Sequence, residues 1–251
     1  MNTPQSQWTN ANAPIGRRIY AVGDIHGRLD LLDELFACIR RDFARRQDVP
    51  TLLIFLGDYV DRGPDSKGVV ERLIDGTPKG FGRFFLKGNH EDMLLNFLQN
   101  PLEAGSWLYN GGDATLFSYG VSSRALRQAM SMRPSGLQDA ATELRKLLPD
   151  RHRTFFNSLA LSLRQGDYFF VHAGVRPRVE LEEQSKEDRL WIRDEFLNWE
   201  GDYGAVVVHG HSPVESPENL ENRIGIDTLA WQSGMLTAVG LEGADRWFIS
   251  T

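Results

Sequence analysis

Five short segments combine glycine with aspartate, asparagine or histidine, and these side chains can bind metal ions and transfer protons. The segments read "GDIHG", "GDYVDRG", "GNHE", "HAG" and "HGH". Five of the six histidines of the chain lie in them, namely His26, His90, His172, His209 and His211. A lone histidine is commonly structural. Five of them, beside acidic and amide side chains, indicate one shared chemical site.

Strands that alternate with helices must position these side chains. Apolar runs such as "RIYAV", "TLLIF", "GRFFL", "DYFFV", "AVVV" and "RIGI" precede polar turns, and the first three are each followed by a segment with amphipathic helical character. This order predicts parallel β-α-β units, in which ligands gather beyond the carboxyl ends of the strands. The segments "MLTAVGLEG" and "DRWFIS" predict a final antiparallel pair.

Length and composition predict one large α/β domain. The chain has 251 residues and a net charge of −6, and this charge gives no indication of nucleic acid or an anionic membrane as partner. Its one cysteine excludes a disulfide framework. Residues 1–16 are expected to be a flexible leader, and residues 17–251 the catalytic domain. Residues 105–165 interrupt the strand–helix order and predict a helical cap. With no signal-peptide pattern and no long apolar run, we expect a cytoplasmic protein.

Acidic residues and imidazoles gathered in one place need cations to balance and bind them. Asp24, Asp58, Asp61 and Asn89 accompany the histidines, without any thiolate. Such a ligand set suits manganese, iron or zinc. Because the donors exceed those of one tetrahedral zinc site, we expect two divalent ions.

The five segments, in this order, resemble the signature of the phosphoprotein phosphatase family of metallophosphoesterases, in particular its bacterial and bacteriophage members. The resemblance covers residues 19–240. It implies a calcineurin-like α/β (α+β) fold, a four-layer αββα sandwich of two mixed sheets flanked by helices.

The resemblance also implies roles for individual side chains. Metal ligands would be Asp24, His26, Asp58, Asn89, His172 and His211, with Asp58 bridging two ions, most simply Mn²⁺. His90 would protonate the leaving oxygen and Asp61 would orient His90. Arg62 would bind phosphate, and Arg193 of "LWIRDEF" would supply a second arginine.

Several neighbouring residues allow more than one interpretation. Glu91 is expected to cap the following helix, and His209 to lie behind the ligands. Asp227 could orient a metal-bound histidine or form a turn. The segment "NGGDATLFSYG" could form a substrate rim or a turn, and His152 is expected at the surface.

Three functions are compatible with these residues. The favoured function is a serine/threonine protein phosphatase that acts on a phosphoprotein or phosphopeptide. The first alternative is a dinucleoside polyphosphate hydrolase, in which the resemblance leads us to expect "ARG" where this chain has "DRG". The second alternative is a non-catalytic metal-binding module. The sequence gives no indication of the oligomeric state.

Overall fold

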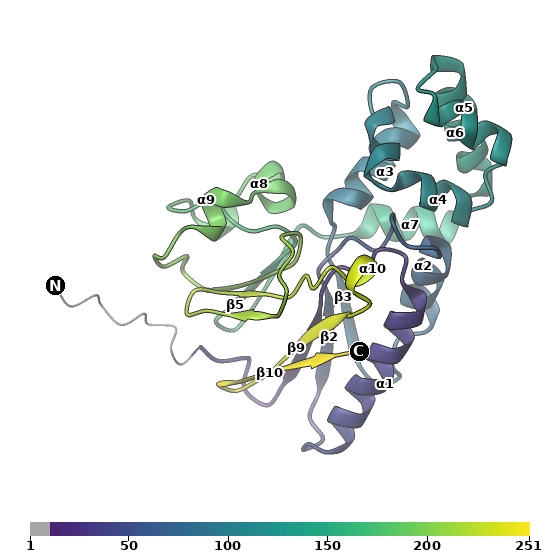
Figure 1. The fold of residues 1–251 in the computed structure, drawn as a ribbon. Coiled ribbons are helices and arrows are strands. Elements are labelled where there is room, and N and C mark those ends of the chain that lie inside the picture. The colour runs from purple at the N-terminus through teal and green to yellow at the C-terminus, as the bar shows by residue number, and fades with distance from the viewer. Residues whose placement is uncertain (1–10) are drawn as a thin grey trace.

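Two five-stranded mixed sheets form the centre of the computed structural model, which describes residues 11–251 (Figure 1). The first sheet has the order β10-β9-β1-β2-β3. Its strands are β1 (Arg18–Val22), β2 (Thr51–Phe55), β3 (Gly82–Phe85), β9 (Thr237–Glu242) and β10 (Asp245–Ser250). The first three run parallel, and β9 and β10 pair antiparallel. The predicted parallel units and final antiparallel pair are therefore confirmed.

The second sheet has the order β4-β5-β6-β8-β7. Its strands are β4 (Ser162–Gln165), β5 (Tyr168–Val171), β6 (Val206–His209), β7 (Glu218–Asn219) and β8 (Arg223–Gly225). The strands β5, β6 and β8 are parallel, whereas β4 and β7 pair antiparallel at the edges. The sequence did not predict these two short edge strands.

The sheets stack face to face because their strands are apolar on both sides. In β1, Ile19 and Ala21 pack against the second sheet, while Tyr20 and Val22 face the helices. On the outer face of the first sheet lie α1 (Leu29–Ala44) and α2 (Ser66–Asp75), and the second sheet is covered by α8 (Lys186–Trp191) and α9 (Asp194–Leu197) (Figure 1). The predicted fold of two mixed sheets flanked by helices is confirmed.

The described end of the predicted leader is attached to this sandwich. Ala11 and Ala13 are buried in the cluster between the sheets, and the Ala13 amide donates to the Gly243 carbonyl at 2.8 Å. Residues 1–10 lie outside the described part of the chain.

Helices make up most of the segment predicted as a cap. They are η2 (Gly105–Asn110), α4 (Gly112–Ser118), α5 (Ser123–Met130), α6 (Pro134–Leu147) and α7 (Asp150–Ser158), next to α3 (Asn89–Gln99). The end of the predicted segment instead forms β4 of the second sheet. The short η3 (Leu181–Glu183) and α10 (Ala230–Ser233) complete the fold.

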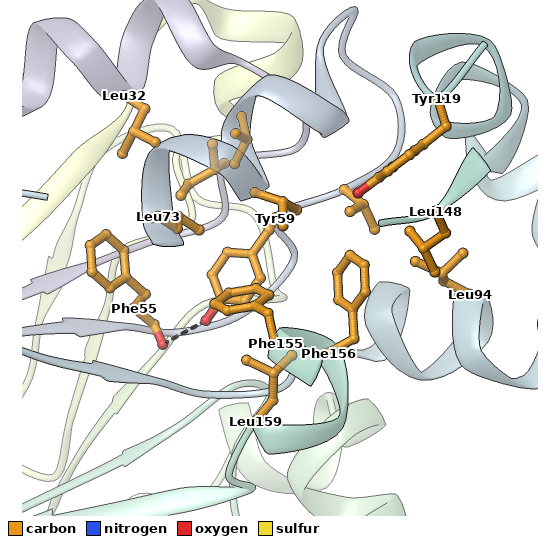
Figure 2. Packing of buried hydrophobic residues seen from close by; sticks show 14 of the residues in the cluster. Leu32, Phe55, Tyr59, Leu73, Leu94, Tyr119, Leu148, Phe155, Phe156 and Leu159 are labelled. Atoms are coloured by element: carbon orange, nitrogen blue, oxygen red, sulfur yellow. Dashed lines mark hydrogen bonds between the residues drawn. The ribbon is translucent and has the colours of Figure 1, made fainter. Parts of the chain in front are cut away.

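Aromatic side chains join the cap to the first sheet (Figure 2). The Phe155 ring of α7 lies 5.1 Å from Phe85 of β3 and 5.7 Å from Tyr59, measured between ring centres. Burying one such side chain contributes about 1.5–3 kcal/mol. The cap therefore shares one hydrophobic cluster with the sheet that carries the chemical motifs.

His152 corrects one sequence expectation. It is completely buried, and its Nδ1 lies 2.8 Å from the Tyr119 hydroxyl. The surface position predicted from its flanking arginines is wrong, because the helix α7 turns this side chain inward.

No helix within residues 11–251 has the length and apolar character needed to cross a bilayer.

Candidate metal centre and active site

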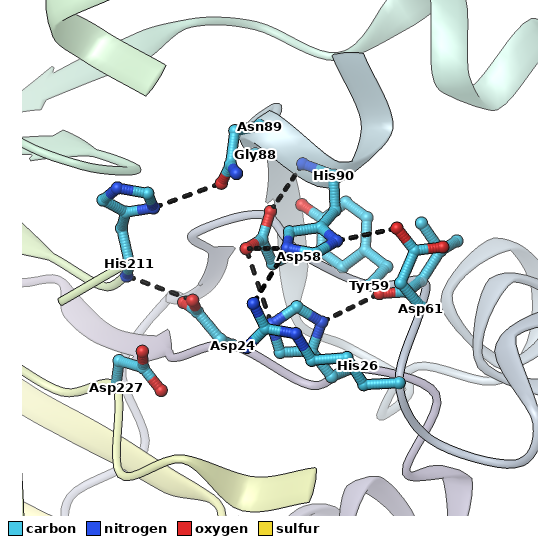
Figure 3. Close-up of polar contacts among 12 residues, drawn as sticks. Asp24, His26, Asp58, Tyr59, Asp61, Gly88, Asn89, His90, His211 and Asp227 are labelled. Carbon is cyan, nitrogen blue, oxygen red and sulfur yellow. Dashed lines mark hydrogen bonds and ion pairs between the residues drawn. The ribbon is translucent and has the colours of Figure 1, made fainter. Parts of the chain in front are cut away.

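The first sheet delivers three of the predicted segments to one edge (Figure 3). Asp24 and His26 follow β1, Asp58 follows β2, and Asn89 begins α3 after β3. Asn89 and His90 therefore lie in the first helical turn and not in the strand exit that the sequence suggested. Gly88 precedes the helix and lies so close to Asp58 that an added Cβ would fall 2.0 Å from the Asp58 carboxylate.

The second sheet brings His172 and His211 to the same place. Asn89 Oδ1 lies 2.8 Å from His172 Nε2 and 3.1 Å from His211 Nδ1. Asp58 Oδ1 lies 3.4 Å from the same His172 nitrogen. Four donor side chains from distant segments thus converge on one small space.

A second group of donors shares the Asp58 carboxylate. Asp58 Oδ2 lies 3.6 Å from His26 Nε2 and 3.8 Å from His90 Nε2. One oxygen of Asp24 accepts from the His211 amide at 3.0 Å. Among the described residues, Asp58 is the carboxylate that lies beside imidazoles of both groups. Within the second group, the resemblance assigns His90 to proton transfer and not to metal binding.

Burial and the neighbouring charges shift the pKa values of these side chains. Burial, together with the nearby Asp227 and Asp58, raises the pKa of Asp24. Burial lowers the pKa of His26 to about 3 and, aided by His172, that of His211 to about 2. The imidazoles are therefore neutral near pH 7, which is the form that binds metals.

The donor set fits divalent metal ions. The other Asp24 oxygen, Oδ1, is buried and has no hydrogen-bond partner within residues 11–251. A buried carboxylate oxygen without a partner is costly, and a bound cation removes that cost. The grouping of carboxylate, amide and imidazole without thiolate is the one expected for manganese, iron or zinc.

Asp61 and His90 form a buried pair next to the donors. Asp61 Oδ2 lies 2.7 Å from His90 Nδ1 and also accepts from the Trp107 indole at 2.7 Å, while Oδ1 accepts from Thr115 at 2.6 Å. Burial lowers the His90 pKa, but Asp58 and Asp61 outweigh this effect and hold the pKa above its usual value. With Nδ1 occupied, Nε2 is the nitrogen that faces the site.

The cap supplies partners of Asp61 that sequence reasoning did not assign. Trp107 and Thr115 belong to η2 and α4, and Gly111 between these two residues accepts the Arg62 amide at 3.1 Å. The segment "NGGDATLFSYG" thus contacts the loop that carries Asp61 and Arg62 directly. Gly111 has φ of +100° and contacts Arg62 so closely that a Cβ would lie 2.6 Å from it. The adjacent glycines Gly111 and Gly112 were the feature of the sequence that could have indicated this close contact.

Glu91 confirms and extends its predicted role as a helix cap. Its carboxylate accepts from the Gly88 amide at 2.9 Å, which is the half of a capping box that remains when the N-cap residue is glycine. It also accepts from the amides of Asp58 and Tyr59 at 2.9 and 2.7 Å. Burial, with the neighbouring Asp58, raises the Glu91 pKa to about 7. Glu91 therefore binds the loop after β2 to the start of α3.

The two predicted phosphate arginines differ in their surroundings. The Arg62 guanidinium lies 3.3 Å from His90 Nε2, and it stacks 5.4 Å from the centre of the exposed Trp231 ring. Arg193 is exposed and precedes α9, and its charge contributes to lowering the pKa of His172 and His211. Both cations therefore act on the same site.

Several site residues adopt backbone angles that favour glycine. The φ angle is +46° at His26, +51° at Asp58, +74° at Asp61, +67° at Arg62 and +60° at His211. Left-handed backbone at residues other than glycine is strained, and such strain clusters at functional sites. Five of the eight non-glycine residues with positive φ in the described part of the chain belong to this site.

His209 and Asp227, whose roles the sequence left open, make structural contacts. His209 is buried, with its ring 4.9 Å from Phe196 and its Nδ1 3.0 Å from the Gly210 carbonyl. Asp227 accepts the Leu229 amide at 2.9 Å, which is the predicted turn alternative. Neither belongs to the two donor groups.

A two-sheet sandwich with carboxylates and imidazoles gathered at its strand ends defines a metallophosphoesterase. The chain belongs to the calcineurin-like phosphoesterase family, whose model matches residues 17–232.

Named relatives divide between two activities. The chain is 28% identical to serine/threonine-protein phosphatase 1 of Salmonella typhimurium, over 96% of this chain and 100% of that protein. It is 24% identical to the bis(5′-nucleosyl)-tetraphosphatase PrpE of Oceanobacillus iheyensis, over 88% and 87% of the two chains. The crystal structure of a candidate diadenosine tetraphosphatase shares the fold, with a TM-score of 0.62, 21% identity and coverage of 96% and 98%.

Proposed function

We propose that this protein is a metal-dependent phosphomonoesterase that removes phosphate from phosphoserine and phosphothreonine in proteins. The observation that carries the proposal is the buried Asp61–His90 pair, whose atoms lie 2.7 Å apart. An alkoxide is a poor leaving group and needs a positioned acid. A phosphoanhydride leaves more easily and requires less of this help.

In the proposed reaction, His90 donates its Nε2 proton to the leaving oxygen. Asp61 fixes the orientation of the ring through Nδ1 and stabilises the charged imidazolium. Arg62, adjacent to Nε2, and Arg193 bind phosphate oxygens through their guanidinium forks.

The six donors Asp24, His26, Asp58, Asn89, His172 and His211 would hold two divalent cations, with Asp58 shared and Mn²⁺ the first choice. Cations bound there would make water acidic enough to attack near neutral pH and would neutralise phosphate charge. No covalent intermediate with the chain is required.

The second candidate is a dinucleoside polyphosphate hydrolase, and the similarity to the PrpE proteins favours it. The decisive comparison is kcat/KM for a phosphothreonine peptide and for diadenosine tetraphosphate, each with Mn²⁺. We expect the peptide to be the better substrate. A clear preference for the tetraphosphate would contradict the proposal. No phosphate released from the peptide and no nucleotide released from the tetraphosphate would together favour the non-catalytic module.

A further inference from the structure

An open cavity next to the donors takes no part in the reaction described above. Its volume is about 460 Å³, and its walls come from α3, η2 and the end of α8. The residues that determine its chemistry are Met93, Asn96, Asn100, Glu103, Trp107 and Trp191.

Two tryptophans connect this cavity to the site. Trp107 lines it and donates from its indole to Asp61, and the Trp191 ring lies 6.1 Å from the His211 ring. The two walls are joined by an ion pair of 2.7 Å between Lys186 and Asp92. A substrate held at His90 and His211 would therefore continue naturally into the cavity.

One wall is a stripe of the helix that carries the catalytic histidine. Met93 and Asn96 are three residues apart and share one face of α3, and Asn100 caps the C-terminal end of this helix. Between His90 and Asn100 the helix rises about 15 Å. An extended peptide covers that distance with about four or five residues.

The lining suits a peptide better than a nucleotide. The exposed side-chain amides of Asn96 and Asn100 make no hydrogen bond to the described part of the chain, so they are free to donate to and accept from a peptide backbone. The indoles and Met93 offer apolar contact. The one charge on the described lining is Glu103, an exposed carboxylate that repels polyphosphate and attracts cationic side chains.

We propose that this cavity binds the residues next to the phosphorylated residue of a protein substrate, and that Glu103 selects substrates with lysine or arginine there. The inference rests on the proposed protein phosphatase function. It goes beyond that function by assigning a second binding region and a preferred sequence.

The test uses phosphothreonine peptides with lysine or glutamate placed at each position within four residues on either side. At one or more positions we expect the wild-type holoenzyme to prefer lysine by about two- to fivefold in kcat/KM, the range of one partly exposed charge pair. Glu103→Lys should reverse the preference. Turnover of p-nitrophenyl phosphate should stay unchanged, because this ester does not reach the cavity.

Two further variants sharpen the result. Glu34→Lys makes the same charge change on an exposed position of α1 and should leave the preference intact. Asn96→Ala should raise KM for all peptides alike. Equal rates for lysine and glutamate peptides, or a preference that Glu103→Lys leaves unchanged, would overturn the inference alone. Turnover of p-nitrophenyl phosphate without any peptide hydrolysis would overturn the proposed function as well.

Discussion

The side chains that the first sheet and the cap contribute to the site are fixed by hydrogen bonds, whereas Arg193, on the side of the second sheet, is not. On the side of the first sheet and cap, Asp61 is completely buried and has hydrogen bonds from Trp107, Thr115 and His90. On the side of the second sheet, Arg193 is exposed, and its side chain makes no hydrogen bond to the described part of the chain. The groups proposed for proton transfer are therefore held in place by the rest of the chain, whereas the side chain of Arg193, proposed to bind phosphate, is not held by a hydrogen bond. Loss of a fixed group should cost more than loss of the adjustable one.

The largest effect is expected where the two sides meet, at Asp58. Asp58→Asn removes the carboxylate that both donor groups share. The imidazoles of His26, His90, His172 and His211 then lose the negative charge that lies next to them all. We expect the metal content to fall below two equivalents per chain, with nearly complete loss of phosphatase activity. Elemental analysis of the purified variant checks this. Two full equivalents would show that Asp58 does not bridge the ions.

His90→Asn probes the fixed side. Without the acid, kcat on a phosphothreonine peptide should fall by about 10²–10⁴-fold. The loss on p-nitrophenyl phosphate should be smaller, because its leaving group needs no proton. Metal content serves as the control and should stay at the wild-type value. Equal losses on the two substrates would remove His90 from the role of acid.

Asp61→Asn should give a smaller loss with a signature in pH. Burial lowers the His90 pKa, whereas Asp58 and Asp61 raise it to a net value above the usual one. The protonated acid is therefore present below that raised pKa and is lost as pH rises through it. With the Asp61 charge removed, the alkaline decline of kcat for alkyl phosphates should move to lower pH. An unchanged decline would separate Asp61 from His90.

The smallest effects are expected from the arginines, and their order tests the comparison directly. Arg62 is anchored by its amide to Gly111 and stacked on Trp231, so Arg62→Ala should raise KM and reduce kcat together. Arg193→Ala should act mainly on KM and several-fold less. Steady-state kinetics on one phosphopeptide measures both. A larger loss from Arg193 would show that exposure is a poor guide to its contribution.

The sequence predicted the parts of this molecule that have local signatures. The parallel strands, the donors after them and the antiparallel end were readable because apolar runs and polar turns are adjacent along the chain. Trp107 and Thr115 were not readable as partners of Asp61, since they reach it from a separate helical segment. The burial of His152 likewise depends on Tyr119, a distant residue. The short edge strands β4 and β7 depend on pairing, which carries little local pattern.

The left-handed backbone at His26, Asp58, Asp61, Arg62 and His211 has a consequence for the evolution of the chain. Each such residue costs about 1–2 kcal/mol relative to an unstrained conformation, with aspartate at the lower end. Glycine would remove that cost at every one of the five positions, yet it would also remove the reactive side chain. Mutations that make this protein more durable by relaxing its turns should therefore arise at the same places where they abolish its chemistry.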